Sequence, residues 1–181
     1  CFQLASESSP ATNTETALIP AGQLLTGGEL PAAVQAELLR TLGTWLPPGR
    51  IPRLAEFLTS GEMAGPTAED GTRLQEACLD AGLAWLTASR NHAGFDATVP
   101  DDADANWWRA QLRQRERPTS SSARFVYDAN LVLLSDADVV ERLIGELPTL
   151  EWSERERSAM LIGLSRDNRG VEMLQNLLRQ S

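Results

Sequence analysis

The stretch ARFVYDANLVLLSDADVVERLIGEL, residues 123–147, decides the fold class. Its first half, 123–134, is dense in apolar side chains and by itself suits either a helix or a strand. No segment elsewhere in the chain has the alternating pattern that a partner strand needs, so we assign 123–134 as a helix. Ser135 is then expected to cap a second helix over 136–147, because its hydroxyl can satisfy a free backbone N–H group. The expected inward residues of that helix are Val139, Val140, Leu143 and Ile144.

Two further helices are predicted downstream. Ser153 followed by Glu156 is a capping-box pattern that opens a helix over 153–165. Its expected apolar residues are Met160, Leu161 and Leu164. The last helix is expected over 169–180, with its apolar residues on one side. These are Val171, Leu174, Leu177 and Leu178.

The helices after residue 123 show a weak internal similarity. Residues 130–135 align with 160–165, and 139–143 align with 171–174, an offset of 30 to 32 residues. An offset of this size is typical of stacked helical hairpins, which would make the C-terminal end a short α-solenoid. The alternative is chance similarity between leucine-rich helices, and the sequence leaves both open.

Four helices are predicted upstream from apolar residues that recur at intervals of three or four. They cover 31–46, 52–60, 68–90 and 103–117. The first is expected to bury Val34, Leu38, Leu42 and Trp45. The third is expected to bury Leu74, Cys78, Ala81, Trp85 and Ala88. Together with the downstream helices, these predict one all-α domain over 29–181, with seven or eight helices packed as antiparallel hairpins.

Composition and net charge indicate a folded single domain and argue against some kinds of partner. The 181-residue chain is 42% apolar and 23% charged, which is typical of a folded protein with a single domain. Its net charge of −9 argues against a nucleic-acid partner, since binding a phosphate backbone requires clustered positive charge. The sequence has no uninterrupted apolar run long enough to span a bilayer. Membrane attachment would therefore have to come from a terminus.

The chain begins with Cys1 and continues as a tail over 1–28 that is rich in Ser, Thr and Pro. A polar tail of this composition cannot bury enough apolar surface to fold alone. A terminal cysteine followed by such a tether resembles a mature bacterial lipoprotein. The resemblance implies covalent lipid on Cys1 as the whole anchor, and Phe2 in place of Asp implies the periplasmic face of the outer membrane rather than the inner membrane. The alternative is that Cys1 is the arbitrary first residue of a fragment.

The other cysteine, Cys78, lies between Ala77 and Leu79 in a predicted helix. Free cysteine in such a setting behaves as a small apolar residue, so we expect it to be buried. The alternative is a disulfide between Cys78 and Cys1, which would suit an oxidising envelope compartment.

The segment 91–106 is expected to be an acidic loop that contains the single histidine, His92, as a surface or capping residue. Three residues match the first, third and fifth ligand positions of a calcium-binding loop: Asp102, Asp104 and Asn106. The pattern then fails, because Trp107 stands where the turn needs Gly and Arg113 where a bidentate Glu is required. We expect no metal site, and Asp101 or Asp102 instead caps the next helix.

The predicted helix over 103–117 carries the main candidate contact surface. Trp108 can face the core, whereas Trp107 points about 100° away around the helix. A cationic stripe at intervals of four lies on the same helix: Arg109, Arg113 and Arg117. Trp and Arg are enriched at the energetic centres of interfaces, so Trp107 and the three arginines are the candidate partner contacts. The alternative is a solvated face whose basic end complements the helix dipole.

Motifs for catalysis are lacking in the sequence. The Gly27-Gly28 pair has no strand-to-helix context, and the segment 163–167 lacks the last glycine of a nucleophile elbow. We therefore expect no enzyme, and no cofactor besides the lipid on Cys1. The leading hypothesis is a lipid-anchored accessory protein that binds protein subunits of a larger envelope complex, similar in general plan to helical outer-membrane lipoproteins of the pilotin type. The alternatives are a cell-wall or glycan-binding module that uses Trp107, and an unanchored helical enzyme of unknown reaction.

Overall fold

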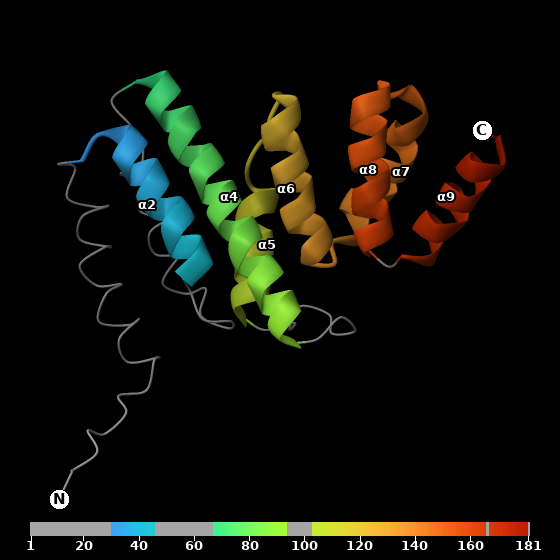
Figure 1. Cartoon of the computed structure of the whole chain (residues 1–181), viewed down its shortest axis with the longest axis horizontal. Coiled ribbons are helices and arrows are strands. Elements are labelled where there is room, and N and C mark those ends of the chain that lie inside the picture. The colour runs from blue at the N-terminus through green and yellow to red at the C-terminus, as the bar shows by residue number, and fades with distance from the viewer. Residues whose placement is uncertain (1–29, 46–66, 94–102, 166, 181) are drawn as a thin grey trace, which may run out of the picture.

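The computed structural model describes residues 30–45, 67–93, 103–165 and 167–180. Within these ranges the chain is helical and contains no strand, so the all-α prediction is confirmed (Figure 1). The elements are α2 (Ala32–Trp45), α4 (Ala68–Ala93), α5 (Ala103–Arg113), α6 (Ser121–Leu133), α7 (Ala137–Glu146), the short 3-10 helix η2 (Leu147–Thr149), α8 (Trp152–Ser165) and α9 (Asn168–Gln180). The predicted tether over 1–28 and the predicted helix over 52–60 lie outside the described residues.

The helices α2, α4, α6, α8 and α9 are stacked in a row that follows their order in the chain, and α5 and α7 lie beside this row (Figure 1). The central helix, α6, packs against α4 on one flank and against α8 on the other. At the two ends of the described row, α2 packs along α4 and α9 packs along α8. The remaining helices bridge these contacts, because α5 packs against α6, and α7 packs against both α6 and α8. This arrangement agrees with the expected packing of helical hairpins.

The stacked helices do not follow the residue-by-residue repeat that the sequence alignment suggested. Asn130 and Leu134 of α6 are 0% and 1% exposed, whereas the aligned Met160 and Leu164 of α8 are 53% and 42% exposed. The next aligned pairs are buried in both helices: Leu131 and Val132 are 1% and 2% exposed, and Leu161 and Ile162 are 2% and 0% exposed. The buried faces of the two helices therefore overlap but do not coincide.

The contact between α2 and α4 is close because one residue at it is glycine. A Cβ atom at Gly43 would lie 2.5 Å from both the Cα atom and the carbonyl oxygen of Ala81. The face that α2 buries differs in part from the prediction, since Val34 is 48% exposed and the side chain of Trp45 is not described. The buried apolar residues of α2 are Ala36, Leu39 and Leu42. The buried face of α2 therefore lies beside the predicted one and shares Leu42 with it, and the lack of a side chain at Gly43 allows the two backbones to approach closely.

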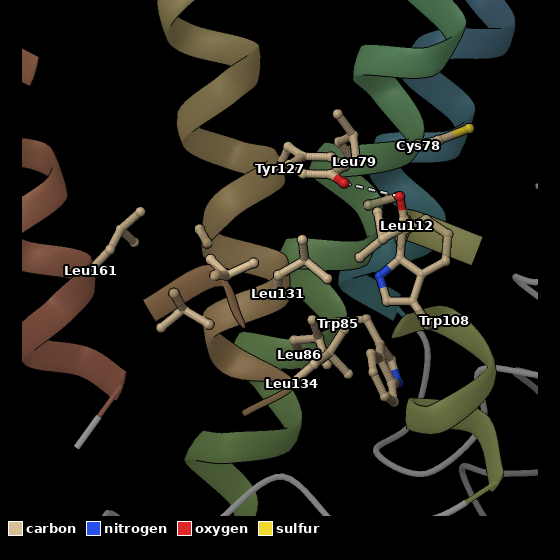
Figure 2. Packing of buried hydrophobic residues seen from close by; sticks show 14 of the residues in the cluster. Cys78, Leu79, Trp85, Leu86, Trp108, Leu112, Tyr127, Leu131, Leu134 and Leu161 are labelled. Atoms are coloured by element: carbon tan, nitrogen blue, oxygen red, sulfur yellow. Dashed lines mark hydrogen bonds between the residues drawn. The ribbon is translucent and has the colours of Figure 1, made fainter. Parts of the chain in front are cut away.

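The buried core runs through α2, α4, α5, α6, α7 and α8, and its two largest side chains, Trp85 and Trp108, lie where α4, α5 and α6 meet. Four residues of the predicted stripe of α4 are buried as expected, whereas Ala88 is only partly buried; the four are Leu74, Cys78, Ala81 and Trp85. Leu112 of α5 is fully buried, and the hydroxyl of Tyr127 on α6 donates a hydrogen bond of 3.0 Å to its carbonyl oxygen (Figure 2). Burying a large apolar side chain contributes about 1.5–3 kcal/mol, so these residues supply most of the stabilisation of the three-helix contact.

Cys78 is a fully buried free thiol within this core. Its predicted role as a small apolar residue is confirmed, and the alternative disulfide with Cys1 is not formed. Burial raises the pKa of the Cys78 thiol to about 12, against the opposing charge of Arg115. A thiol with such a pKa is neither a nucleophile nor a metal ligand near neutral pH.

One buried amide, Asn130, joins the three core helices. Its Nδ2 donates to the carbonyl oxygen of Leu79 on α4 at 3.0 Å and to that of Val126 on α6 at 2.8 Å. Its Oδ1 accepts a hydrogen bond of 3.1 Å from Nε1 of Trp108 on α5. Every polar atom of this fully buried side chain is therefore paired, as burial of an amide requires.

The boundaries of α7 and α8 correct two capping predictions. Ser135 does not cap α7: its φ of 58° turns the chain after α6. The cap is Asp136, whose carboxylate accepts a hydrogen bond of 3.3 Å from the backbone N–H of Val139. Asp satisfies the free N–H group and also places negative charge at the positive end of the helix. Ser153 lies within the first turn of α8 instead of preceding it, so the predicted capping box is wrong.

The two glycines Gly43 and Gly71 provide a matched test of the α2–α4 contact. We expect Gly43→Ala to lower the free energy of unfolding by about 1–3 kcal/mol, because the new methyl group meets backbone that cannot move aside. Gly71→Ala on α4 should instead raise it by up to about 1 kcal/mol, since nothing lies within 4 Å and alanine favours a helix. Urea denaturation followed by circular dichroism measures both. Equal effects of the two substitutions would contradict the close contact.

Candidate functional site

The adjacent tryptophans of α5 both belong to the core region. Trp108 is 1% exposed, so the prediction that it faces the core is confirmed. Figure 2 shows its ring among the buried residues of α4 and α6. Trp107 is half-buried and stacks on Trp108, with ring centroids 6.2 Å apart and ring planes 18° apart. Trp107 is therefore not the exposed platform that the glycan-binding alternative required.

Two of the three candidate contact arginines bind the corner between α6 and α7. Both Nε and Nη2 of Arg109 donate to the carbonyl oxygen of Leu134, the Nε bond being 3.1 Å long. Arg113 donates from Nε to Asp136 at 2.7 Å and from Nη2 to Asp138 at 3.0 Å. These hydrogen bonds hold α5 against the residue that caps α7.

Arg117 does not extend the cationic stripe, because α5 ends at Arg113 and not at residue 117 as predicted. Arg117 instead donates to Asp128 on α6 at 3.2 and 2.5 Å, and to Glu146 on α7 at 2.7 and 3.0 Å. Arg142 donates to the same Asp128 at 2.6 Å. Asp128 is 2% exposed, so its charge depends on these two arginines. The network links α6, α7 and the segment that follows α5.

The carboxylate of Asp136 is stabilised by one arginine and by the start of α7. Burial by itself would raise its pKa, but the hydrogen bond and charge of Arg113 and the backbone N–H bonds at the start of α7 hold the pKa below its usual value. Asp136 is completely buried, whereas the side chain of Arg113 is 52% exposed. Asp136 therefore remains ionised in the folded protein well into the acid range.

A small polar cavity lies between α6 and α8, next to Arg117. Its volume of about 20 Å³ is roughly that of one ordered water molecule. The charged residues that line it carry three positive and three negative charges: Arg117, Arg124, Arg157, Asp128, Glu146 and Glu154. The cavity is thus balanced in charge, and Arg124 is already paired with Glu154 across it. The space inside it is about large enough for one water molecule.

Three of the five large apolar side chains that are exposed in the described ranges lie on α8. Trp152 is 77% exposed, Met160 53% and Leu164 42%, whereas Val34 of α2 and Val171 of α9 are 48% and 43% exposed. With Glu156 the three residues of α8 form a line at intervals of four residues, which we call the α8 row: Trp152, Glu156, Met160 and Leu164. Residues at this spacing form one of the surface ridges through which helices pack on one another. The row spans about 18 Å along the helix.

The residues that α8 buries explain why the α8 row is exposed to solvent. Leu161 and Ile162 are 2% and 0% exposed. Leu161 lines the cavity between α6 and α8. Ile162 packs against α9, since a Cβ atom added to Gly170 would lie 2.4 Å from Cγ2 of Ile162. With these two residues inward, Met160 and Leu164 point outward.

A signal for the α8 row is present in the sequence. The five large apolar residues of this helix are distributed around most of its circumference: Trp152, Met160, Leu161, Ile162 and Leu164. A helix packed on one side cannot bury so wide an arc. Periodicity alone does not say which part of the arc faces the core, because that depends on where α6 and α9 pack.

Other predicted site residues lie at or beyond the limits of the described residues. Cys1 and Asp102 fall outside them, and the side chains of Asp104 and His92 are not described. His92 belongs to the last turn of α4 and not to a loop, since that helix continues to residue 93. Within the described ranges there is no group of three or more potential metal-ligating side chains. No helix in those ranges is long and apolar enough to cross a membrane.

The pair of Asp136 and Arg113 makes stability depend on pH. We expect Asp136→Asn to lower the free energy of unfolding at pH 7 by about 1–2 kcal/mol, because Asn keeps a capping oxygen but loses the charge that binds Arg113. Because the pKa of Asp136 is lower folded than unfolded, this stabilisation is complete above the unfolded pKa of about 3.9 and disappears as pH falls through the folded pKa.

Urea denaturation of the wild type and the variant between neutral and acid pH measures this effect. Asp138→Asn is the matched control, since Asp138 binds the same arginine but its side chain is 82% exposed. We expect it to change the free energy by less than about 0.5 kcal/mol. A difference between wild type and Asp136→Asn that stays constant down to acid pH would contradict the assignment.

Comparison of the chain with known protein families, with curated proteins and with solved structures found no match. Function is therefore inferred from side-chain exposure, charge and the sequence of the N-terminus. Of these features, the α8 row is the described surface that most resembles a binding site.

Proposed function

We propose that this protein is a lipid-anchored accessory protein of the bacterial cell envelope that binds another protein through its helical surface. The α8 row is the observation that carries the binding part of the proposal. The anchoring part is supported by the sequence, in which Cys1 precedes a polar tether as in mature lipoproteins. In this proposal the periplasmic face of the outer membrane is the location, and subunits of a membrane-associated complex are the partners.

The composition of the α8 row supports contact with a protein. Tryptophan and methionine are enriched in protein interfaces, and tryptophan is frequent among the residues that contribute most binding energy. Trp152 is 77% exposed, so its large apolar surface stays in water unless a partner covers it. A ridge of side chains at intervals of four also has the geometry that a partner helix can pack against.

The candidate contact arginines give weaker support. Arg109, Arg113 and Arg117 each bind a group of this same chain, so using them for a partner would cost internal hydrogen bonds. The α8 row can be covered without breaking any internal contact described above. For this reason the proposed contact surface is α8 and not α5.

A photo-crosslinking amino acid in place of Met160 tests the binding surface. In the full-length protein within its native envelope, we expect irradiation to produce a protein adduct of one defined mass, identified by mass spectrometry. The control is the same amino acid in place of Val34, which is similarly exposed on α2 at 48%. Adducts at both positions, or at neither, would count against the α8 row as the contact surface.

The anchor is tested separately by mass spectrometry of the N-terminal peptide from native membranes. We expect Cys1 to carry the mass of two or three acyl chains, because a single chain gives only marginal membrane binding. A Cys1→Ser variant should be released from the membrane fraction by a salt wash. An unmodified Cys1 in native material would remove the anchoring part of the proposal and leave the binding part in place.

A further inference from the structure

We infer that the polar cavity between α6 and α8 is a binding site for one small monovalent anion of the halide class. This inference goes beyond the proposed function and does not depend on it, because the cavity lies where α8 faces α6 and not on the α8 row. Three observations support it: the charge count around the cavity, the hydrogen-bond donors that line it, and its size.

Every carboxylate that lines the cavity is already bound by an arginine of this chain. Arg117 binds Asp128 at 2.5 Å and Glu146 at 2.7 Å. Glu154 pairs with Arg124. Because each carboxylate has its own cationic partner, the three acids do not by themselves repel an anion from the cavity.

The arginines of this cluster outnumber its acids by one. Arg142 is not part of the lining but binds Asp128 at 2.6 Å, so its charge belongs to the same cluster. Its buried Nε has no hydrogen-bond partner within the described part of the chain. With Arg142 included, four arginines stand against three carboxylates: Arg117, Arg124, Arg142 and Arg157 against Asp128, Glu146 and Glu154. One bound anion neutralises this excess positive charge, whereas a water molecule does not.

The excess charge belongs to Arg157, which lines the cavity from α8. No ion pair or hydrogen bond joins its guanidinium group to another residue of the described ranges. Two hydroxyl groups also line the cavity, Ser121 of α6 and Ser158 of α8, and neither is hydrogen-bonded to a described residue. The guanidinium group can only donate, and each hydroxyl group has a proton to donate, so one anion satisfies all three groups.

The size and position of the cavity suit a halide ion. The space has room for about one water molecule, and a halide ion is a single sphere close to that size. Arg157 and Ser121 are exposed, so an ion can enter from solvent without separation of the helices. An ion held by groups of both α6 and α8 would stabilise the contact between these two helices.

Thermal unfolding of the full 181-residue chain, followed by circular dichroism, tests this inference. Sodium chloride replaces sodium gluconate stepwise at constant ionic strength, so that only the anion changes. We expect the midpoint of unfolding to rise and then saturate, by about 3–6 °C at ten times the dissociation constant, because the ion binds only the folded state. A midpoint that shows no saturating rise overturns the inference.

Three variants locate the effect. Arg157→Gln should abolish the saturating rise, and it should remain folded because Arg157 is exposed. Ser158→Ala should raise the dissociation constant for chloride about fivefold, since one hydrogen bond is lost. Arg73→Gln is the matched control, because Arg73 lies on α4 with its side chain 42% exposed and pairs with Glu69, away from the cavity. It should keep the wild-type rise, and equal responses of wild type and Arg157→Gln overturn the inference.

Crystals grown in sodium bromide identify the occupant directly. We expect one anomalous peak between α6 and α8 beside Arg157 in the wild type, and none at this position in Arg157→Gln. A missing peak, or a peak that persists in the variant, overturns the inference. A bromide peak without the saturating chloride response is an adventitious ion only and also overturns it. Phosphate in the cavity of crystals grown with both sodium phosphate and sodium bromide would reject the halide class.

Discussion

The buried amide of Asn130 is the contact on which the described structure depends most. It accepts from Trp108 of α5 and donates to the backbone of α4, so it sets the position of α6 relative to both. The site has no spare room: a Cβ at Gly82 would lie 2.8 Å from Asn130 Oδ1 and 2.7 Å from Cζ2 of Trp108. Because an unpaired buried amide is costly, only the arrangement that satisfies all of its hydrogen bonds is stable.

Hydrogen bonds from arginine side chains connect this core to the helices that follow it in the chain. Arg109 and Arg113 bind the corner at which α6 turns into α7, and Arg117 joins the buried carboxylate of Asp128 to Glu146. The positive charges of this acidic protein are thus used where the chain changes direction. A cationic segment that resembles a binding site in the sequence connects helices within the fold.

The contrast between α6 and α8 explains where an outside contact can form. α6 is covered by α4 on one flank and α8 on the other, and its residues Asn130 and Leu134 are buried. α8 has α6 on one flank and the last described helix, α9, on the other, and its outer ridge stays in water. An exposed ridge of Trp, Met and Leu is the kind of apolar patch that marks a contact site for another protein.

The sequence by itself determined the helical class, the extents of most described helices to within a few residues, and much of the core. Leu74, Cys78, Trp85 and Trp108 were all placed correctly, because helical spacing puts each of them on the apolar face of its helix. Only the tertiary structure decided which ambiguous residues face outward. Val34, Met160 and Leu164 suit a buried face by composition, but the positions of neighbouring helices left them in water. The roles of Asp136 and the three arginines were likewise invisible in the sequence, because a hydrogen bond between helices depends on how they pack and not on the spacing within either one.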